Sequence, residues 1–113
     1  MAGNLNLQVF RKTTKHYLLK FKKNGIARNI TNWTIYFTVK EKMSDEDSAA
    51  KINHNITSHP DGINGKTLIT LTQDDTNRVG EFWYDVTYKD DNDNVGVLFY
   101  GKILFTEKAT QRA

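Results

Sequence analysis

The sequence predicts an all-β fold, a sandwich of two sheets with about seven or eight antiparallel strands. Short runs in which apolar and polar residues alternate recur along the chain, as in strands that are covered on one face. Turn-forming residues separate these runs at intervals of roughly 8 to 12 residues. No stretch shows an amphipathic helical pattern of useful length. The length of 113 residues fits a single β-sandwich domain, 1–113.

The N-terminal third contains two predicted strands. Residues 4–10 place Leu5, Leu7 and Val9 on one face, which suits a first strand at a sheet edge. Residues 16–23, HYLLKFKK, are apolar on one face in the same way. The Asn-Gly pair at 24–25 follows directly, and these residues tolerate positive φ, so we expect a tight hairpin turn there.

The clearest alternation in the chain spans 33–40. We expect four of its side chains to face the core and Tyr36 to face outward. The inward set is Trp33, Ile35, Phe37 and Val39. Alternation stops in 41–50, EKMSDEDSAA, which we expect to cross from one sheet to the other, with Ser44 capping one short helical turn.

The middle of the chain combines weak strands with strong turns. Residues 51–57 predict a polar strand at an edge, and 67–72 predict another strand. Between them, 58–65 holds Pro-Asp-Gly and Asn-Gly turn signals. The polar segment 73–79 is expected to make one helical turn, capped by Thr72, while crossing between sheets.

Residues 80–105 predict an antiparallel hairpin at the centre of the fold. Phe82 and Tyr84 fall on the inward face of its first strand and Trp83 on the outward face, while 90–94 forms the turn. A strand that begins with glycine after a crossing turn and then alternates is typical of immunoglobulin-like sandwiches, although the antibody cysteines are absent. We therefore predict an immunoglobulin-like antiparallel β-sandwich, with 107–113 as a frayed tail.

Composition narrows the functional classes. The net charge is +3 and cysteine is absent, which excludes disulfides, cysteine zinc sites and thiol catalysis. No apolar run approaches the length of a membrane span, and no leader pattern opens the chain. Basic residues cluster in the first third, and we interpret them as solvated edge charges that hinder strand aggregation. We expect neither a nucleic-acid nor a membrane partner.

The sequence shows no constellation of reactive residues. It has neither a nucleophile elbow nor a glycine-rich phosphate loop, and its paired carboxylates, such as Asp74 and Asp75, lie in predicted loops. His16, His54 and His59 lie on three separate elements. The acidic loop 90–94 departs from the calcium-loop template at the required glycine and glutamate. We predict no catalytic residue, no cofactor and no metal site.

Outward-facing aromatic residues are the remaining functional signal. Trp83, Tyr36 and Tyr100 are predicted on outer strand faces, where aromatic rings anchor protein interfaces or stack on sugars. The alternative is that loops cover both sheet faces. The density of apolar residues on both faces of 97–105 favours a strand that is covered or contacts a partner.

From Trp33 onward the chain resembles one family through the order and spacing of several segments. These are ITNW at 30–33, a DG turn at 61–62 followed by GKTLITLT at 65–72, DDT at 74–76, GEFWYDV at 80–86 and LFYGKI at 98–103. In this order they resemble the immunoglobulin-like domains of tailed-phage and prophage structural proteins, such as the N-terminal domains of upper baseplate proteins. The resemblance implies a domain that builds or decorates a virion and catalyses nothing.

The resulting expectation is a non-enzymatic structural or interaction protein. Its partners would be other virion proteins or copies of itself, and it would be made in the host cytoplasm and reside in the virion, tail-associated or baseplate-like. The alternative is a carbohydrate-binding module that uses the same aromatic residues to contact host cell-wall glycans.

Overall fold

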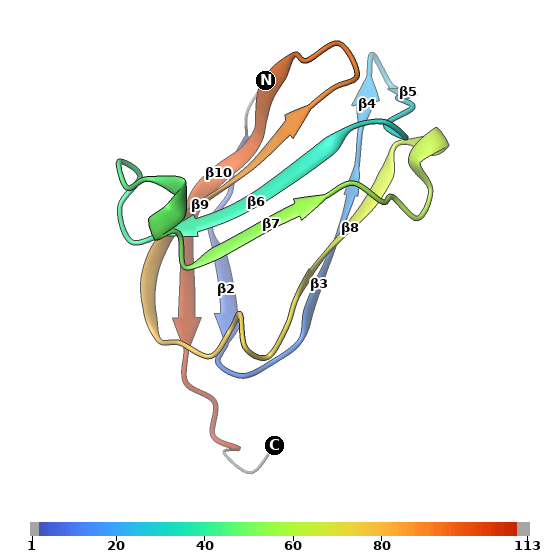
Figure 1. Cartoon of the computed structure of the whole chain (residues 1–113). Helices are drawn as coiled ribbons and strands as arrows, with labels where there is room; N and C mark the ends of the chain where they lie inside the picture. The colour runs from blue at the N-terminus through green and yellow to red at the C-terminus, as the bar shows by residue number, and fades with distance from the viewer. Residues whose placement is uncertain (1–2, 111–113) are drawn as a thin grey trace.

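The computed structural model describes residues 3–110, which form strands joined by turns and two short 3₁₀ helices, η1 and η2 (Figure 1). The strands are β1 (Gly3–Asn4), β2 (Leu7–Phe10), β3 (Lys15–Lys20), β4 (Lys22–Lys23), β5 (Ile26–Ala27), β6 (Thr34–Lys40), β7 (Ile52–Ile56), β8 (Lys66–Leu71), β9 (Gly80–Lys89) and β10 (Val95–Thr106). The 3₁₀ helices are η1 (Asp47–Ala49) and η2 (Gly62–Asn64). Within 3–110, no helix is long and apolar enough to cross a membrane.

Two sheets form the sandwich. The large sheet has the order β1-β10-β9-β6-β7, with β2 also paired to β10, and the small sheet consists of β3 and β8. The short pair β4 and β5 forms a separate arm. In an immunoglobulin variable domain one sheet contains strands C′, C, F and G and the other contains B and E. Here β7, β6, β9 and β10 take the first set of places and β3 and β8 the second, so the fold is an immunoglobulin-like β-sandwich, as the sequence predicted.

The N-terminal strand differs from the prediction. It divides into β1 and β2, and both pair with β10 in parallel, so the large sheet is mixed rather than antiparallel. The division falls at Leu5 and Asn6, where the Tyr84 hydroxyl donates to the Leu5 carbonyl oxygen. At the same place the Lys102 N–H donates to the Asn6 side chain. Side-chain alternation specifies which face a residue occupies but not the direction of the neighbouring strand.

The predicted central strand and hairpin are confirmed. In β6 every second residue is buried, and in β9 Tyr84 and Val86 point into the core. Strands β9 and β10 pair from Lys89 with Val95 down to Gly80 with Phe105. The ladder shifts between Val97 and Phe99. A bulge of this kind bends the strand locally, and here the consecutive residues Leu98 and Phe99 both pack against the core.

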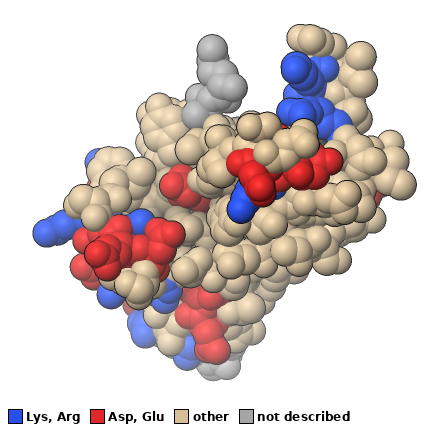
Figure 2. All heavy atoms as spheres, turned by 45° about the horizontal axis from the view of Figure 1, so that its top comes forward, with Lys and Arg blue, Asp and Glu red and all other residues tan. Residues whose placement is uncertain are grey.

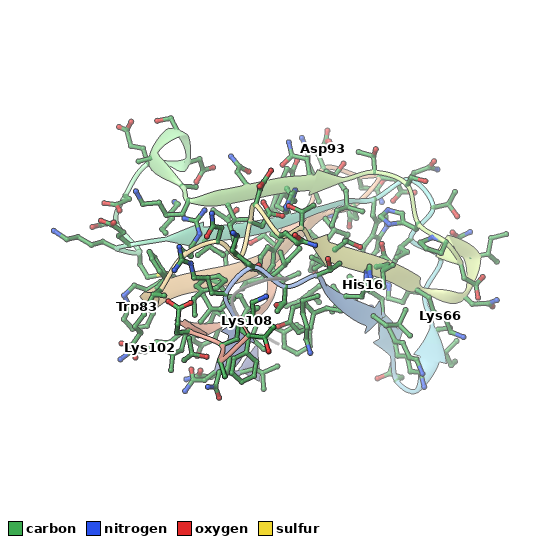
Figure 3. All side chains as sticks on the ribbon, turned by 90° about the horizontal axis from the view of Figure 1, so that it is seen from below. His16, Lys66, Trp83, Asp93, Lys102 and Lys108 are labelled. Atoms are coloured by element: carbon green, nitrogen blue, oxygen red, sulfur yellow. The ribbon has the colours of Figure 1, made fainter. Side chains whose placement is uncertain are left out.

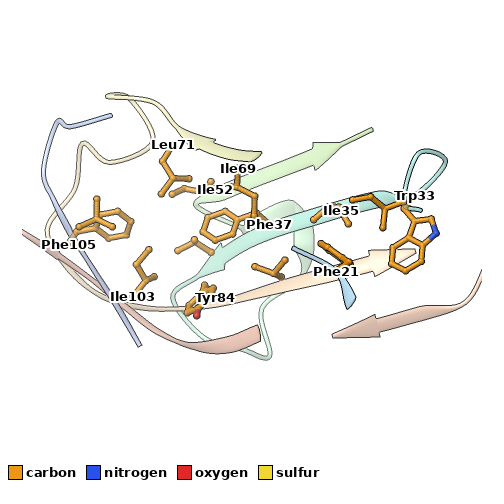
Figure 4. Packing of buried hydrophobic residues seen from close by; sticks show 14 residues of the cluster. Phe21, Trp33, Ile35, Phe37, Ile52, Ile69, Leu71, Tyr84, Ile103 and Phe105 are labelled. Carbon is orange, nitrogen blue, oxygen red and sulfur yellow. The ribbon is translucent and has the colours of Figure 1, made fainter. Parts of the chain in front are cut away.

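The core lies between the two sheets (Figure 4). The large sheet contributes Ile35, Phe37, Val39, Tyr84, Val86, Ile103 and Phe105, and the small sheet contributes Ile69 and Leu71. At one end Trp33 stacks on Tyr88 with ring centroids 5.0 Å apart, and Phe21 meets Trp33 edge-on at 5.5 Å. Aromatic packing therefore closes this end of the sandwich.

Two turns depend on positive φ. Asn24 and Gly25, with φ of 54° and 77°, join β4 to β5 as the sequence predicted. Gly65 has φ of 75°, and a Cβ added there would lie 2.5 Å from the carbonyl oxygen of Phe21. Only glycine fits at this close approach, because it has no side chain.

The segment 41–50 does not cross between sheets, contrary to the sequence prediction. It joins β6 to β7, which are antiparallel neighbours in the large sheet. Its short helix η1 is preceded by Glu46 and has no side-chain cap, so Ser44 does not cap it. After β6 the chain crosses between the sheets at 57–65 and at 72–79, and the sequence predicted the second of these crossings. In the latter, Thr72 and Asp75 exchange reciprocal side-chain to backbone bonds of 2.9 and 3.2 Å around a turn.

The predicted tail, 107–113, extends to residues 111–113, which lie outside the described residues. Within the described part, Glu107 forms an ion pair with Arg11 at 3.0 Å. This contact ties the residue that follows β10 to the end of β2.

Candidate interface on the outer face of the large sheet

The outer face of the large sheet is the side turned away from β3 and β8. Strand register places one set of side chains from four adjacent strands on it. The set is Thr34, Tyr36, Thr38 and Lys40 on β6, Asn53 and Asn55 on β7, Glu81, Trp83, Asp85, Thr87 and Lys89 on β9, and Val95, Val97, Tyr100, Lys102 and Leu104 on β10.

The β10 side of this face carries exposed apolar side chains among charged ones. Trp83, Tyr100 and Leu104 are 37%, 39% and 38% exposed, and Val97 is 41% exposed. Trp83 lies opposite Lys102, so Tyr100 and Leu104 are its diagonal neighbours on β10. Diagonal pairs in an antiparallel sheet are close enough for large side chains to touch. We call Val97, Tyr100, Leu104 and Trp83 the apolar ridge.

Lysine side chains flank the tryptophan. The Nζ of Lys102 lies 5.1 Å from the Trp83 ring centroid and 3.3 Å from Glu81 Oε1 (Figure 3). On the other side, Lys40 stands opposite Trp83 in the register and forms an ion pair with Asp47 at 2.9 Å. Both ammonium groups are thus held by acidic partners, and the register places the two lysines on either side of Trp83.

The β6 and β7 half of the face is a polar groove of about 520 Å³. Tyr36, Asn53, Asn55, Asp85 and Thr87 are among the residues that line it. Partial burial raises the pKa of the Asp85 carboxyl above its usual value, while the Thr87 hydroxyl and the nearby Lys40 oppose the shift. The groove offers amide, hydroxyl and carboxyl groups beside one aromatic ring.

The structure brings the three predicted interface residues onto one face but into two zones. Trp83 and Tyr100 belong to the apolar ridge, whereas Tyr36 is only partly exposed and lines the groove. Their role in binding stays a prediction. Leu104 and Lys102 were not predicted as interface residues, although both lie on the same outward face of β10 as Tyr100. Counting forward from Tyr100 in steps of two would have identified them.

The three histidines do not converge. His16 contacts Thr70 at 3.0 Å, and the His54 Nε2 donates to Asp75 at 2.8 Å. His59 donates from Nε2 to the Trp33 carbonyl oxygen at 2.7 Å, and its Nδ1 lies 2.7 Å from Thr67 Oγ1. Each ring therefore bonds to its own local partners. Across residues 3–110 no group of three His, Asp or Glu side chains is placed to hold a metal ion.

The acidic loop between β9 and β10 is a closed turn. The Asp90 carboxylate accepts the backbone N–H groups of Asn92 and Asn94, both at 2.9 Å. The Asn94 side chain also donates to it at 3.2 Å. Asp90, the residue that a calcium loop would use as its first ligand, therefore has its carboxylate hydrogen-bonded within the turn.

Charges are distributed unevenly over the surface. Acidic side chains gather in separate patches, and basic side chains cover the projecting arm of β4 and β5 (Figure 2). Beside the apolar ridge the register places the charged residues Lys40, Glu81, Asp85 and Lys102, and interface centres are commonly bordered by polar residues in this way.

Comparisons with known proteins give likenesses of fold alone. No family model matches the chain. No curated protein matches it either. The structure is similar to the N-terminal domain of phage TP901-1 ORF48, with a TM-score of 0.48, 10% identity and coverage of 95% of this chain and 98% of that chain. It is also similar to the PKD domain of human KIAA0319, with a TM-score of 0.45, 11% identity and coverage of 99% and 85%. A third likeness is to murine CRIg, with a TM-score of 0.43, 13% identity and coverage of 91% and 92%.

Proposed function

We propose that this chain is a non-enzymatic interaction module that binds a protein partner through the apolar ridge. The observation that carries the proposal is the ridge itself, four apolar side chains exposed on the same outer face of β9 and β10. Aromatic residues at the centre of such a patch commonly supply most of the binding free energy. A sheet face also holds its side chains in fixed positions, so little conformational entropy is lost on binding.

The proposed setting is a bacteriophage virion, with the chain as a tail-associated, baseplate-like component. Support comes from the ordered sequence resemblance between 30 and 103, which centres on the hairpin that presents the ridge. The partner would be another virion protein or a second copy of this chain. Rigid complementary faces are the usual basis of such assemblies.

The test compares particles assembled with two variants. A Trp83→Ala/Leu104→Ser double variant removes the centre of the ridge, and Leu68→Ser removes an apolar side chain of equal exposure, 37%, from the small sheet. Particles from the host that encodes the chain would be purified, and its copy number measured by quantitative mass spectrometry. We expect the double variant to be lost from particles, because truncation of one central tryptophan costs about 2 kcal/mol or more, roughly thirtyfold in affinity.

The control variant should be incorporated normally. Circular dichroism of both purified variants would establish that they are folded. Absence of the wild-type chain from particles would refute the virion setting, and normal incorporation of the double variant would refute the role of the ridge.

The polar groove favours a second candidate function, recognition of a cell-wall glycan. Tyr36 beside Asn53, Asn55 and Asp85 offers a ring and several hydrogen-bonding groups in one recess of about 520 Å³. Retention on purified host cell walls would be measured for wild type, Tyr36→Ala and Trp83→Ala. This function requires retention that Tyr36→Ala abolishes and Trp83→Ala leaves in place, and it is rejected if the wild type is not retained.

A further inference from the structure

The small sheet has an open edge at β3. Strand β3 pairs only with β8, from Lys15 with Leu71 to Lys20 with Lys66. In immunoglobulin sandwiches a first strand commonly continues the sheet beyond strand B. Here β1 and β2 pair with β10 in the other sheet instead. Among residues 3–110, no strand occupies the place beside β3.

The register identifies the backbone groups that this edge exposes. The Phe21 N–H donates to the Gly65 carbonyl oxygen at 2.7 Å, and this bond shows which residues of β3 have backbone groups directed toward β8. In an antiparallel pair, alternate residues bond across the ladder and the residues between them direct their backbone groups away. Tyr17 and Leu19 therefore bond toward β8. The N–H and C=O groups of His16, Leu18 and Lys20 point to the open edge.

An apolar slit runs beside the same edge. It has a volume of about 200 Å³ and lies between β3 and the β1, β2 and β10 side of the large sheet. Leu5, Leu7, Tyr17, Leu19 and Phe99 line it, with core residues below. Leu5 is 49% exposed and Leu18 is 58% exposed. A strand laid along β3 would place every second side chain over this slit.

Charge indicates what kind of strand fits. Residues 1–40 contain no Asp or Glu, and all of the acidic residues come later in the sequence. Lys15 and Lys20 belong to β3, Lys22 follows immediately, and Lys66 faces Lys20 across the small sheet. A second copy would bring another basic edge against this one, which like-charge repulsion disfavours. An acidic segment would be attracted.

We propose that the β3 edge binds an extended segment of another protein, in which acidic and apolar residues alternate, by adding it to the small sheet as a third strand. The backbone of His16, Leu18 and Lys20 supplies the hydrogen bonds, the slit receives the apolar side chains, and the lysines meet the acidic ones. Strand addition at an open sheet edge is an established mode of peptide recognition. This surface lies on the opposite sheet from the apolar ridge and does not depend on the ridge's function.

The test uses a blocked seven-residue peptide of alternating Glu and Val as the probe, with a Lys and Val peptide as the charge control. Binding would be followed at low salt by amide shifts in NMR spectra of the full chain. We expect the shifts to centre on His16, Leu18 and Lys20 and the Lys and Val peptide to bind at least about tenfold more weakly. N-methylation of one alternate set of peptide residues should abolish binding, whereas methylation of the other set should be tolerated.

A pair of proline variants locates the site on the protein. Leu18→Pro removes an N–H that points to the open edge, and Leu68→Pro is the matched change on β8, whose N–H points to the opposite edge. We expect about tenfold or weaker binding in Leu18→Pro and unchanged binding in Leu68→Pro. The N-methylated peptides keep the test valid if Leu18→Pro does not fold.

Four results would overturn the proposal. One is no binding of the Glu and Val peptide at millimolar concentration. Another is equal tolerance of N-methylation in both alternate sets. The third is a set of shifts centred on Trp83 instead of β3. Self-association of the free chain that Leu18→Pro abolishes would also overturn it, because the edge would then pair with a second copy.

Discussion

The two sheets of this sandwich differ in how completely their strands are paired. In the large sheet, β9 lies between β6 and β10 and has partners on both sides over most of its length. Among the described residues the small sheet consists of two strands, each with an edge that no other strand there continues. The two sheets therefore present different groups to a binding partner. The large sheet forms a platform whose central strands are paired on both sides and which presents a side-chain surface, whereas β3 of the small sheet presents backbone groups.

The largest expected effect tests whether the large sheet supplies most of the stability. Phe37 is 1% exposed and packs 5.9 Å from Tyr84, ring centroid to centroid. We expect Phe37→Ala to lower the free energy of unfolding by about 3–5 kcal/mol, because the cavity cannot close between two sheets. Urea denaturation measures it. A loss below about 1 kcal/mol would show that the platform is not rigidly packed.

The next effect concerns the bond that attaches the N-terminal segment to the large sheet. The buried Tyr84 hydroxyl donates to the Leu5 carbonyl oxygen, and burial, with a smaller contribution from Tyr17, raises the pKa of Tyr84 to about 12. Tyr84→Phe should cost about 1–2 kcal/mol at pH 7. The raised pKa means that the folded chain holds this proton more tightly than the unfolded chain does.

The stability from this tyrosine is therefore complete below pH 10 and decreases as pH rises from 10 toward 12. Urea titrations at several pH values would show a steeper loss in the wild type than in Tyr84→Phe. Parallel curves for the two proteins over this range would contradict the assignment.

A smaller effect concerns the link between the β8–β9 crossing and the edge of the large sheet. Asp75 accepts hydrogen bonds from the Thr72 backbone at 2.9 Å and from His54 at 2.8 Å. Partial burial acts to raise the pKa of Asp75, but these two donors outweigh it and hold that pKa below its ordinary value. The carboxylate therefore stabilises the fold above its unfolded pKa, and this contribution is lost as pH falls through the folded pKa.

We expect Asp75→Asn to cost about 1 kcal/mol at pH 7 and to unfold with the same free energy as the wild type at the acid end of the titration. Urea denaturation across the pH range compares the two proteins. A difference between them that is independent of pH would mean that the charge of Asp75 contributes nothing.

The smallest effect concerns the outer face of the small sheet. Leu68 is 37% exposed and lies opposite Leu18. We expect Leu68→Ala to change the free energy of unfolding by no more than about 0.5 kcal/mol. A cost above about 1.5 kcal/mol would mean that this face is covered in solution, and it would remove the contrast between the sheets.

Sequence patterns predicted the parts of the fold that depend on local chemistry. Alternation in 33–40 and 80–89 identified the inward faces, and Asn24-Gly25 marked a turn, since these signals reside in neighbouring residues. The parallel pairing of β2 with β10 joins residues almost a chain length apart and leaves no local pattern. The segment 41–50 was misassigned because its length permits either a hairpin or a crossing.

The candidate site was predictable to a similar degree. Parity placed Trp83, Tyr36 and Tyr100 on one face, because every second side chain of a strand points the same way. Trp83 and Tyr100 lie in the ridge and Tyr36 in the groove because of the order of the strands in the sheet, and alternation along one strand does not reveal that order. The open edge of β3 was also hidden, since it depends on where the N-terminal strand pairs.

Amide hydrogen exchange of the free chain, followed by NMR, tests the contrast between the two sheets most directly. It should show slow exchange for the central amides of β6 and β9 and for Tyr17 and Leu19 of β3. The amides of His16, Leu18 and Lys20 should exchange at least about a hundredfold faster than those of Tyr17 and Leu19, because no strand bonds to them. Equal protection of odd and even residues along β3 would contradict the account, since it would mean that the edge is already occupied.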